Sequence, residues 1–262
     1  MEGPAVAVPF LNSLFRPLYN YLVSASSQPV RFLQPQTLLI DADDTLWENM
    51  IHFEQAIADF ISHLDHQTHT AEEVRNHLNE VERETIKAHG YGLKNFQRSL
   101  ICCFEQLTGG EISEQNRQTI GLFVRSVADR EIELLPGVAD TLADLFTRHK
   151  LILVTKGDTL EQTDKLIRSG LANYFQAVEV LAEKHRDAYS SLIERHQFQS
   201  GRTWMIGNSP RSDINPALAA GLNAIFIPHS STWVLEHELV NRAPDGQTLL
   251  EIDGFAKLSS YF

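Results

Sequence analysis

The chain has 262 residues, which is enough to bury one large core or a core with a smaller second domain. Hydrophobic residues make up 43% of the sequence and charged residues 21%, as in ordinary globular proteins. Lys and Arg number 22 and Asp and Glu 34, so the formal net charge is −12. No basic stretch with interleaved aromatic residues occurs in the sequence, and we therefore expect no nucleic acid partner.

The sequence also indicates the compartment. No apolar run reaches the length that spans a bilayer, and the N-terminus lacks the positively charged stretch that opens a secretory signal. The two cysteines, Cys102 and Cys103, are adjacent, which suits neither an ordinary structural disulfide nor a zinc site. We expect a cytoplasmic protein in a reducing compartment, with no membrane partner.

Residues 1–36 are predicted to form a helical N-terminal extension. Six apolar side chains recur at helical spacing between residues 11 and 22, although Pro17 disturbs the pattern. A stripe of this kind usually faces a core, which we favour here. The alternative is an oligomer contact through this helix, whereas the low basic charge of the stripe disfavours a peripheral membrane segment.

The next stretch, residues 37–47, has the pattern of a buried strand that ends in a functional site. Residues 38–40 form a short apolar run that is typical of a strand buried on both faces of a parallel sheet. Asp41 and Asp43 follow where this strand should end, which is where open α/β sheets bind ligands, and strand geometry would put both on one side. Two carboxylates so close repel each other unless a cation or a shared proton relieves them. The pattern therefore favours a metal site or an acid–base pair.

Residues 52–134 read as helical throughout, so an all-helical insertion interrupts the first strand–helix unit. Thr70 with Glu73 matches a capping box, and Ser113 matches a helix N-cap. We expect this insertion to form a cap over the carboxyl end of the first strand. Its histidines match no closed zinc pattern and are interpreted as a solvated helix face and turn: His63, His66, His69 and His77.

From residue 135 onward, predicted strands alternate with predicted helices. Strands are predicted over residues 151–154, 177–181, 204–206 and 224–227, and helices over 138–149, 159–169, 187–196 and 213–220. This alternation predicts an α/β fold with a Rossmann-like, doubly wound parallel sheet. The predicted core thus comprises residues 37–51 and 135–262.

Polar residues follow each of the first four core strands. Because the carboxyl ends of parallel strands meet at one edge of the sheet, we expect these side chains to converge. Acids, a hydroxyl, an ammonium and an amide together suit a phosphate bound with a divalent cation. The residues are Asp41 and Asp43 after the first strand, Thr155, Lys156 and Gly157 after the second, Lys184 after the third, and Asn208 and Asp213 after the fourth.

These residues resemble the motifs of the haloacid dehalogenase-like (HAD) hydrolase superfamily, most of whose members are phosphatases. The similarity covers about residues 37–230 and is to the phosphatase type with a helical cap inserted after the first strand. All four superfamily motifs occur in order: Asp41-Ala42-Asp43-Asp44-Thr45, Thr155, Lys184, and Gly207-Asn208 with Asp213.

The resemblance implies a catalytic role for four residues. Asp41 would be the nucleophile that forms an aspartyl-phosphate intermediate, and Asp43 would protonate the leaving alcohol and then activate water. Thr155 would donate its hydroxyl to a phosphoryl oxygen, and Lys184 would hold the phosphate and the charge of the nucleophile. The implied activity is Mg²⁺-dependent hydrolysis of a small-molecule phosphate monoester.

The implied cofactor is Mg²⁺, bound by Asp41, the backbone carbonyl of Asp43 and the last motif. Many superfamily members have Asp where this chain has Asn208, and that Asp is commonly a metal ligand. Asn208 offers only a neutral oxygen, so the sequence leaves open whether Asn208 or Asp213 coordinates the ion directly.

Substrate binding is expected to involve the second motif and the insertion. The backbone amides of Lys156 and Gly157 would help to bind phosphate, whereas the Lys156 side chain is expected either at the phosphate or in solvent. We hypothesise that a loop around Tyr91 brings Lys94 or Arg98 to an anionic leaving group. The alternative is an ordinary loop with solvated charges.

Other functions stay open on sequence alone. A 2-haloacid dehalogenase would use the same nucleophile, but the family's dehalogenases lack a carboxylate at the position of Asp43. A phosphomutase and a catalytically silent phosphate-ester-binding protein are further alternatives. A signalling receiver domain also groups Asp, Thr and Lys, yet such domains are compact and lack a large helical insertion.

Overall fold

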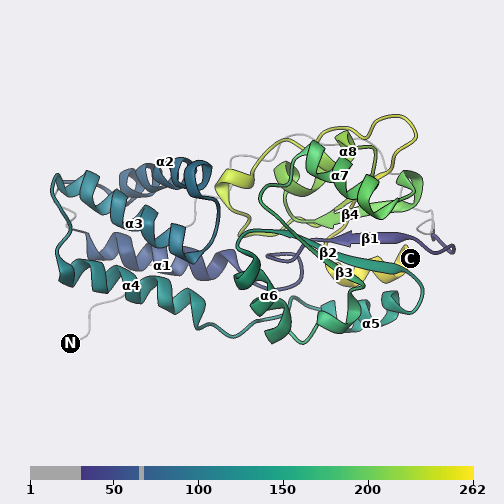
Figure 1. The fold of residues 1–262 in the computed structure, drawn as a ribbon, viewed down its shortest axis with the longest axis horizontal. Helices are drawn as coiled ribbons and strands as arrows, with labels where there is room; N and C mark the ends of the chain where they lie inside the picture. The colour runs from purple at the N-terminus through teal and green to yellow at the C-terminus, as the bar shows by residue number, and fades with distance from the viewer. Residues whose placement is uncertain (1–30, 65–67) are drawn as a thin grey trace, which may run out of the picture. The chain divides into compact units, whose positions relative to one another are not determined.

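The computed structural model describes residues 31–64 and 68–262. The predicted N-terminal helix, with the oligomer contact suggested for it, and His66 lie outside these residues. Figure 1 shows two groups of elements in the described part: four helices that follow one another along the chain, and a sheet with helices around it.

The sheet is parallel throughout and has the strand order β3-β2-β1-β4-β5-β6. This confirms the predicted α/β, Rossmann-like fold. Five strands lie where the sequence predicts them, but β6 was not predicted because its three residues are too few to show a pattern. The strands are β1 (Thr37–Ile40), β2 (Lys150–Lys156), β3 (Ala177–Leu181), β4 (Thr203–Gly207), β5 (Asn223–Phe226) and β6 (Leu249–Glu251).

Helices cover both faces of the sheet (Figure 1). Alternate side chains of a strand point to opposite faces, so Leu38 and Ile40 of β1 join one hydrophobic cluster and Leu39 joins another. The first cluster includes side chains of α5 and α6, and the second includes side chains of α7 and α8. The helices are α5 (Val138–Phe146), α6 (Thr159–Arg168), α7 (Arg186–His196) and α8 (Asn215–Ala219).

The helix predicted over residues 213–220 is shorter than expected. Pro210 opens a wide helical turn, Pro210–Ile214, and α8 begins only at Asn215, with Pro216 in its first turn. Proline has no backbone N–H to donate and is tolerated at the start of a helix rather than inside it, so the two prolines divide this segment.

The helical insertion is defined here as residues 50–128, and it has a hydrophobic cluster of its own. In this cluster α1 lies against α4, and α2 lies against α3. The capping box of Thr70 and Glu73 and the N-cap Ser113 are present as predicted. The helices are α1 (Met50–His63), α2 (Ala71–His89), α3 (Leu93–Thr108) and α4 (Glu114–Ala128).

The chain enters and leaves the helical insertion through two adjacent segments. Trp47 forms an antiparallel bridge with Leu134, and the backbone amide of Leu135 donates to the carbonyl of Leu46 at 2.9 Å. Because this bridge begins four residues after Asp43, the insertion is anchored beside the acidic end of β1.

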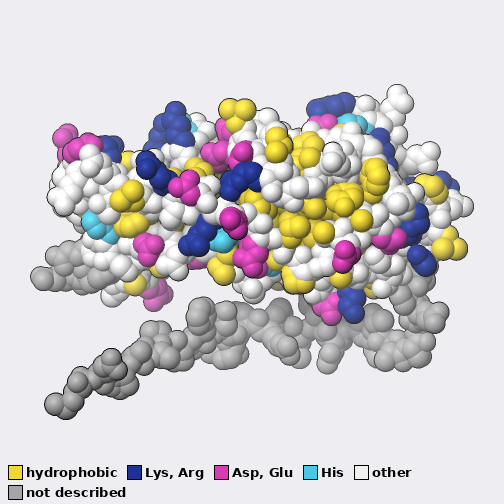
Figure 2. Space-filling view, turned by 90° about the horizontal axis from the view of Figure 1, so that it is seen from below, with side chains coloured by type: hydrophobic (Ala, Val, Ile, Leu, Met, Phe, Trp, Pro, Cys, Tyr) yellow, Lys and Arg dark blue, Asp and Glu magenta, His cyan; other side chains and the backbone are white. Residues whose placement is uncertain are grey.

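No helix among residues 31–64 and 68–262 is long and apolar enough to cross a membrane. On the face shown in Figure 2, basic and acidic side chains are interspersed, and hydrophobic side chains gather over the half of the molecule that holds the sheet. Cys103 is buried, Cys102 is half-buried, and both are free thiols.

Candidate active site

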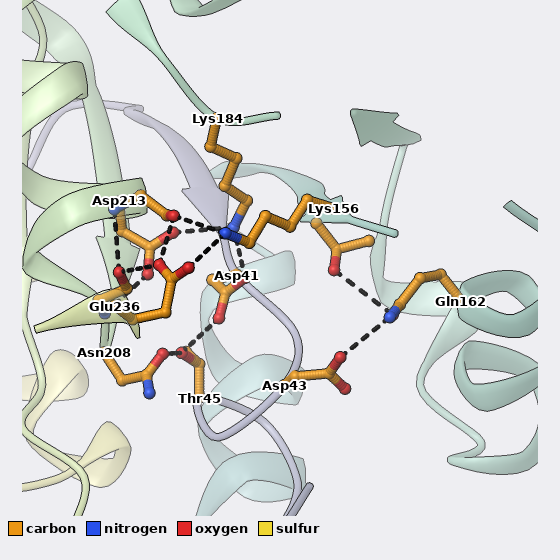
Figure 3. Close-up of polar contacts among 12 residues, drawn as sticks. Asp41, Asp43, Thr45, Lys156, Gln162, Lys184, Asn208, Asp213 and Glu236 are labelled. Atoms are coloured by element: carbon orange, nitrogen blue, oxygen red, sulfur yellow. Dashed lines mark hydrogen bonds and ion pairs between the residues drawn. The ribbon is translucent and has the colours of Figure 1, made fainter. Parts of the chain in front are cut away.

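The carboxyl ends of the parallel strands border a cavity of about 190 Å³. Its lining includes the strand-end residues that the sequence predicts to converge, whereas Lys94 and Arg98 do not line it. Figure 3 shows Asp41 facing Lys184, with Asp43 turned the other way toward Gln162. The strand-end residues in the lining are Asp41, Asp43, Thr155, Lys156, Gly157, Lys184, Asn208 and Asp213.

Lys184 lies between two buried carboxylates. Its ammonium donates to Asp41 and, at 2.8 Å, to Asp213, and both carboxylates are less than a tenth exposed. Burial alone would lower the pKa of Lys184, but the charges of Asp213 and Asp41 hold it above its ordinary value. Burial and the charge of Asp41 raise the pKa of Asp213 to about 7, although Lys184 opposes this. One ammonium therefore leaves an excess of negative charge here.

Gly207, the last residue of β4, allows Asp213 to approach the sheet. A Cβ atom at this position would clash with the Asp213 carboxylate. The amide of Ser209 donates to the same carboxylate at 2.9 Å, so both Asp213 oxygens have protein partners, one in Ser209 and one in Lys184. The position of Asp213 thus follows from the residues around it.

Two oxygens that would suit a hard cation, Asp41 Oδ2 and Asn208 Oδ1, both lie near the Thr45 hydroxyl. The Thr45 hydroxyl lies 2.9 Å from Asp41 Oδ2 and 3.4 Å from Asn208 Oδ1. Carboxylate and amide oxygens are ligands that Mg²⁺ accepts, and a cation would offset the excess negative charge of this cluster. The donor set fits a magnesium ion.

Asp43 is held by three side chains that the sequence did not point to. Lys165 approaches both its oxygens, at 2.6 and 2.7 Å, while Gln162 and Trp47 donate at 2.9 and 2.8 Å. Burial alone would raise the pKa of Asp43, but Lys165 and the two other hydrogen bonds hold it below its ordinary value. Gln162 and Lys165 are three residues apart on α6 and so share one face, a spacing that is too common to single them out from sequence.

The second motif is only partly available to a ligand. Thr155 is almost fully buried, and its hydroxyl lies 3.4 Å from the Gln162 side-chain oxygen. The Gly157 amide, which the resemblance assigns to phosphate, donates instead to the Leu181 carbonyl at 3.2 Å and so continues the pairing of β2 with β3.

The Lys156 side chain lines the cavity rather than pointing into solvent, and it is only 16% exposed. Its ammonium forms an ion pair with Glu236 at 2.5 Å and also contacts the hydroxyls of Ser212, at 2.8 Å, and Tyr91, at 3.1 Å. Burial alone would lower the pKa of Lys156, but Glu236 and Tyr91 raise it above its ordinary value. Since Tyr91 belongs to the insertion, Lys156 connects the insertion to the core.

The helical insertion supplies the other wall of the cavity. Lys94 and Arg98 are exposed, and Arg98 donates to the Asn95 side chain at 3.1 Å. Tyr91 and Trp233 border the cavity and meet edge to face at 6.5 Å. The part of the cavity that the following insertion residues line is called its far end: Phe53, Glu82, Ile86, Asn95, Phe96 and Ser99.

A second acidic group lies close by. Side-chain atoms of Asp44, Glu48 and His229 lie within 4.8 Å of one another. Asp44 already accepts the backbone amides of Asn49 and Met50, at 2.9 and 3.0 Å, and so caps the N-terminus of α1. Burial raises the pKa of Asp44 to about 7, with a smaller contribution from Asp43. The contacts of Asp44 are those of a helix cap.

Known proteins are similar to this chain in sequence and in fold. A glyceraldehyde 3-phosphate phosphatase from Methanothermobacter thermautotrophicus is 29% identical over 185 residues, which cover 67% of this chain and 77% of that protein. A haloacid dehalogenase-like family hydrolase from Xanthomonas campestris superposes with a TM-score of 0.71 at 29% identity, covering 86% of this chain and 93% of the other. A 2-haloacid dehalogenase from Pseudomonas syringae shares the fold at 18% identity, with a TM-score of 0.56 and coverage of 86% and 97%.

The family model for haloacid dehalogenase-like hydrolases matches residues 38–227. This range begins in β1, ends just after β5 and includes every strand-end residue that lines the cavity. The chain therefore belongs to the haloacid dehalogenase-like hydrolase family.

Proposed function

We propose that this protein is a Mg²⁺-dependent phosphatase that hydrolyses a small-molecule phosphate monoester through an aspartyl-phosphate intermediate. The observation that carries the proposal is the pair of carboxylates, Asp41 and Asp43, at the edge of one cavity with Lys184 beside them. The phosphatase named above, 29% identical, supports the same reaction class.

In the proposed reaction Asp41 attacks phosphorus, the bond to the leaving oxygen breaks, and Asp43 gives that oxygen a proton. Asp43, now a carboxylate, takes a proton from the water that attacks the acyl phosphate. This frees Asp41 and releases inorganic phosphate. Lys184 keeps Asp41 in place through the hydrogen bond between them and supplies positive charge beside the transferred phosphoryl group.

Asp41, the Asp43 backbone carbonyl and the last motif would hold the Mg²⁺ ion. When bound, the ion would supply positive charge that neutralises the phosphoryl oxygens. We favour Asn208 over Asp213 as the direct ligand from the last motif. Both oxygens of Asp213 already have protein partners, whereas Asn208 Oδ1 is contacted only by the Thr45 hydroxyl, at 3.4 Å, among the residues described.

We further propose that residues 52–134 act as a cap domain on a core of residues 37–51 and 135–262. In support, the insertion contributes one wall of the cavity, and its Tyr91 contacts both Lys156 and Glu183 of the core. A cap in this place would exclude water from the phosphoryl group and contact the leaving group.

The test is hydrolysis of p-nitrophenyl phosphate by the purified chain with and without Mg²⁺, together with Asp41→Asn. The exposed Asp140→Asn variant is the matched control. We expect Mg²⁺-dependent turnover that Asp41→Asn abolishes and Asp140→Asn retains, with both variants folded by circular dichroism. Turnover that survives Asp41→Asn, or that ignores Mg²⁺ removal by EDTA, would refute the mechanism.

The second candidate is a 2-haloacid dehalogenase, because one such enzyme shares the fold. In that reaction Asp41 would displace halide from carbon, and no leaving-group acid would be needed. The Asp43 carboxylate, with its three donors, has no role in that chemistry and favours the phosphatase. Release of chloride from 2-chloropropionate, with no release of phosphate from any ester, would reverse this choice.

A further inference from the structure

The far end of the cavity holds a carboxyl group with no hydrogen-bond partner among residues 31–64 and 68–262. Glu82 lies on α2, in the middle of the helical insertion, and lines the cavity although it is only 7% exposed. Its Oε2 atom is buried and has no hydrogen-bond partner among the described residues. Buried polar atoms are nearly always paired in folded proteins, so this atom calls for an explanation.

On balance, the surroundings of Glu82 disfavour its charged form. Burial raises its pKa to about 7; the positive charge of Arg75 opposes this rise and the negative charge of Glu54 adds to it. A carboxyl group placed here costs folding free energy at neutral pH that an apolar side chain such as Leu would not. A residue that costs stability and faces a cavity indicates a ligand-binding role.

The other side chains at this end have little capacity left for hydrogen bonds. The Ser99 hydroxyl donates to the Asn95 backbone carbonyl at 3.1 Å, and the Asn95 amide group donates to the carbonyls of His89 and Gly90. Phe53 and Phe96 meet edge to face at 5.0 Å. Within the described insertion, Glu82 is therefore the one charged group in a largely apolar lining.

This chemistry discriminates among leaving groups. An acidic group would meet the Glu82 carboxyl in a cavity that eight acidic and only three basic side chains line. A sugar would need several free donors and acceptors, which this end lacks. A single ammonium suits both the carboxyl group and the aromatic rings that line the same cavity.

We propose that Glu82 is a specificity residue that binds a primary ammonium group on the alcohol moiety of the phosphate monoester. This inference rests on the proposed function and names its substrate class. Glu82 lies seven residues before the end of α2, about 10 Å along the helix axis at 1.5 Å per residue. Glu82 thus lies deeper in the insertion than Tyr91, which follows α2 and contacts Lys156 of the core, and the best chain length between ammonium and phosphate is measured by the ester series below.

The experiment compares three series of phosphate esters on the full chain with Mg²⁺. ω-Aminoalkyl phosphates of two to six carbons are matched with n-alkyl phosphates, in which a methyl replaces the ammonium, and with ω-hydroxyalkyl phosphates. We expect kcat/KM to favour the amine by at least about tenfold at the best chain length. That ratio should collapse in Glu82→Gln and persist in the exposed control Glu80→Gln.

A second readout does not depend on turnover. ¹³C NMR of the Glu82 carboxyl at pH 6 should report ionisation when 4-amino-1-butanol is added, and no change with 1-pentanol. Equal kcat/KM for the three series, while p-nitrophenyl phosphate is still hydrolysed, would overturn the ammonium site and leave the phosphatase standing. Absence of turnover with every ester would refute the phosphatase, and the NMR titration would still decide whether Glu82 binds an amine.

Discussion

The two ends of the cavity differ in whether their carboxylates are paired with a positive charge. At the sheet edge, the carboxylates of Asp41 and Asp213 share Lys184, and Asp43 is paired with Lys165. In the helical insertion, Glu82 Oε2 has no partner among the residues described. The difference indicates what each end is for. The sheet edge is organised by the protein in advance, as expected for a group that every substrate shares, whereas the far end leaves its pairing to the ligand.

The largest effect is expected from replacing Lys184, whose ammonium pairs with both Asp41 and Asp213 at the sheet edge. In Lys184→Met, Asp41 and Asp213 would remain buried without their ammonium, and loss of one partner from a buried ion pair costs about 3–5 kcal/mol. We expect kcat for p-nitrophenyl phosphate to fall by about 10³-fold or more and the urea midpoint to fall as well. The exposed Lys150→Met is the control. A variant with wild-type stability and activity would show that Lys184 is not the organising charge.

Lys165→Met tests the second ion pair of the sheet edge. Because Lys165 holds the pKa of Asp43 below its ordinary value, its removal should raise that pKa. Asp43 is the acid that protonates the leaving oxygen, so the limb of the kcat/KM profile that falls as Asp43 loses its proton should move to higher pH. Lys165→Arg keeps the positive charge and should keep the wild-type limb. A pH profile that is identical in wild type, Lys165→Met and Lys165→Arg would show that the titration of Asp43 does not determine the pH dependence of activity.

Glu82→Gln tests the far end of the cavity through the pH dependence of folding stability. The pKa of Glu82 in the folded chain, about 7, lies above its ordinary value of 4.5, so the folded form keeps a proton that the unfolded chain releases between these values. Wild-type stability should therefore fall as pH rises through this window, by up to about 3 kcal/mol at 1.36 kcal/mol per pKa unit.

Gln does not titrate, so the free energy of unfolding of Glu82→Gln should increase relative to that of wild type between pH 5 and pH 8. Urea unfolding at both pH values measures this, and Glu80→Gln should track wild type. If the difference in unfolding free energy between Glu82→Gln and wild type stays the same at both pH values, folding does not raise the pKa of Glu82.

In the helical insertion, local sequence patterns predicted the helices and their caps but not which side chains face the core. The capping box at Thr70, the N-cap at Ser113 and the amphipathic spacing of four helices depend on residues that are close in sequence, and all were predicted. The hypothesis about Lys94 and Arg98 depended instead on which face of α3 meets the core. Both side chains are exposed and neither lines the cavity, because the apolar face of α3 is the one that packs.

At the sheet edge the sequence alone was sufficient to place residues as distant as Asp41 and Asp213 near one another. A parallel sheet brings the carboxyl ends of its strands to one edge, so buried apolar runs followed by polar residues determine the neighbourhood. Pattern also determines the alternation of Leu38, Leu39 and Ile40 between the two faces of the sheet.

Only the tertiary structure decided the partners. Lys165 meets Asp43, Glu236 meets Lys156, and Glu82 meets none among the described residues. Hydrogen bonds and ion pairs act over about 3 Å, and a helix turned by one residue presents a different side chain to the same point. Sequence periodicity determines which face of an element is buried, but the rotation and packing of that element determine which side chain its face brings to a neighbour.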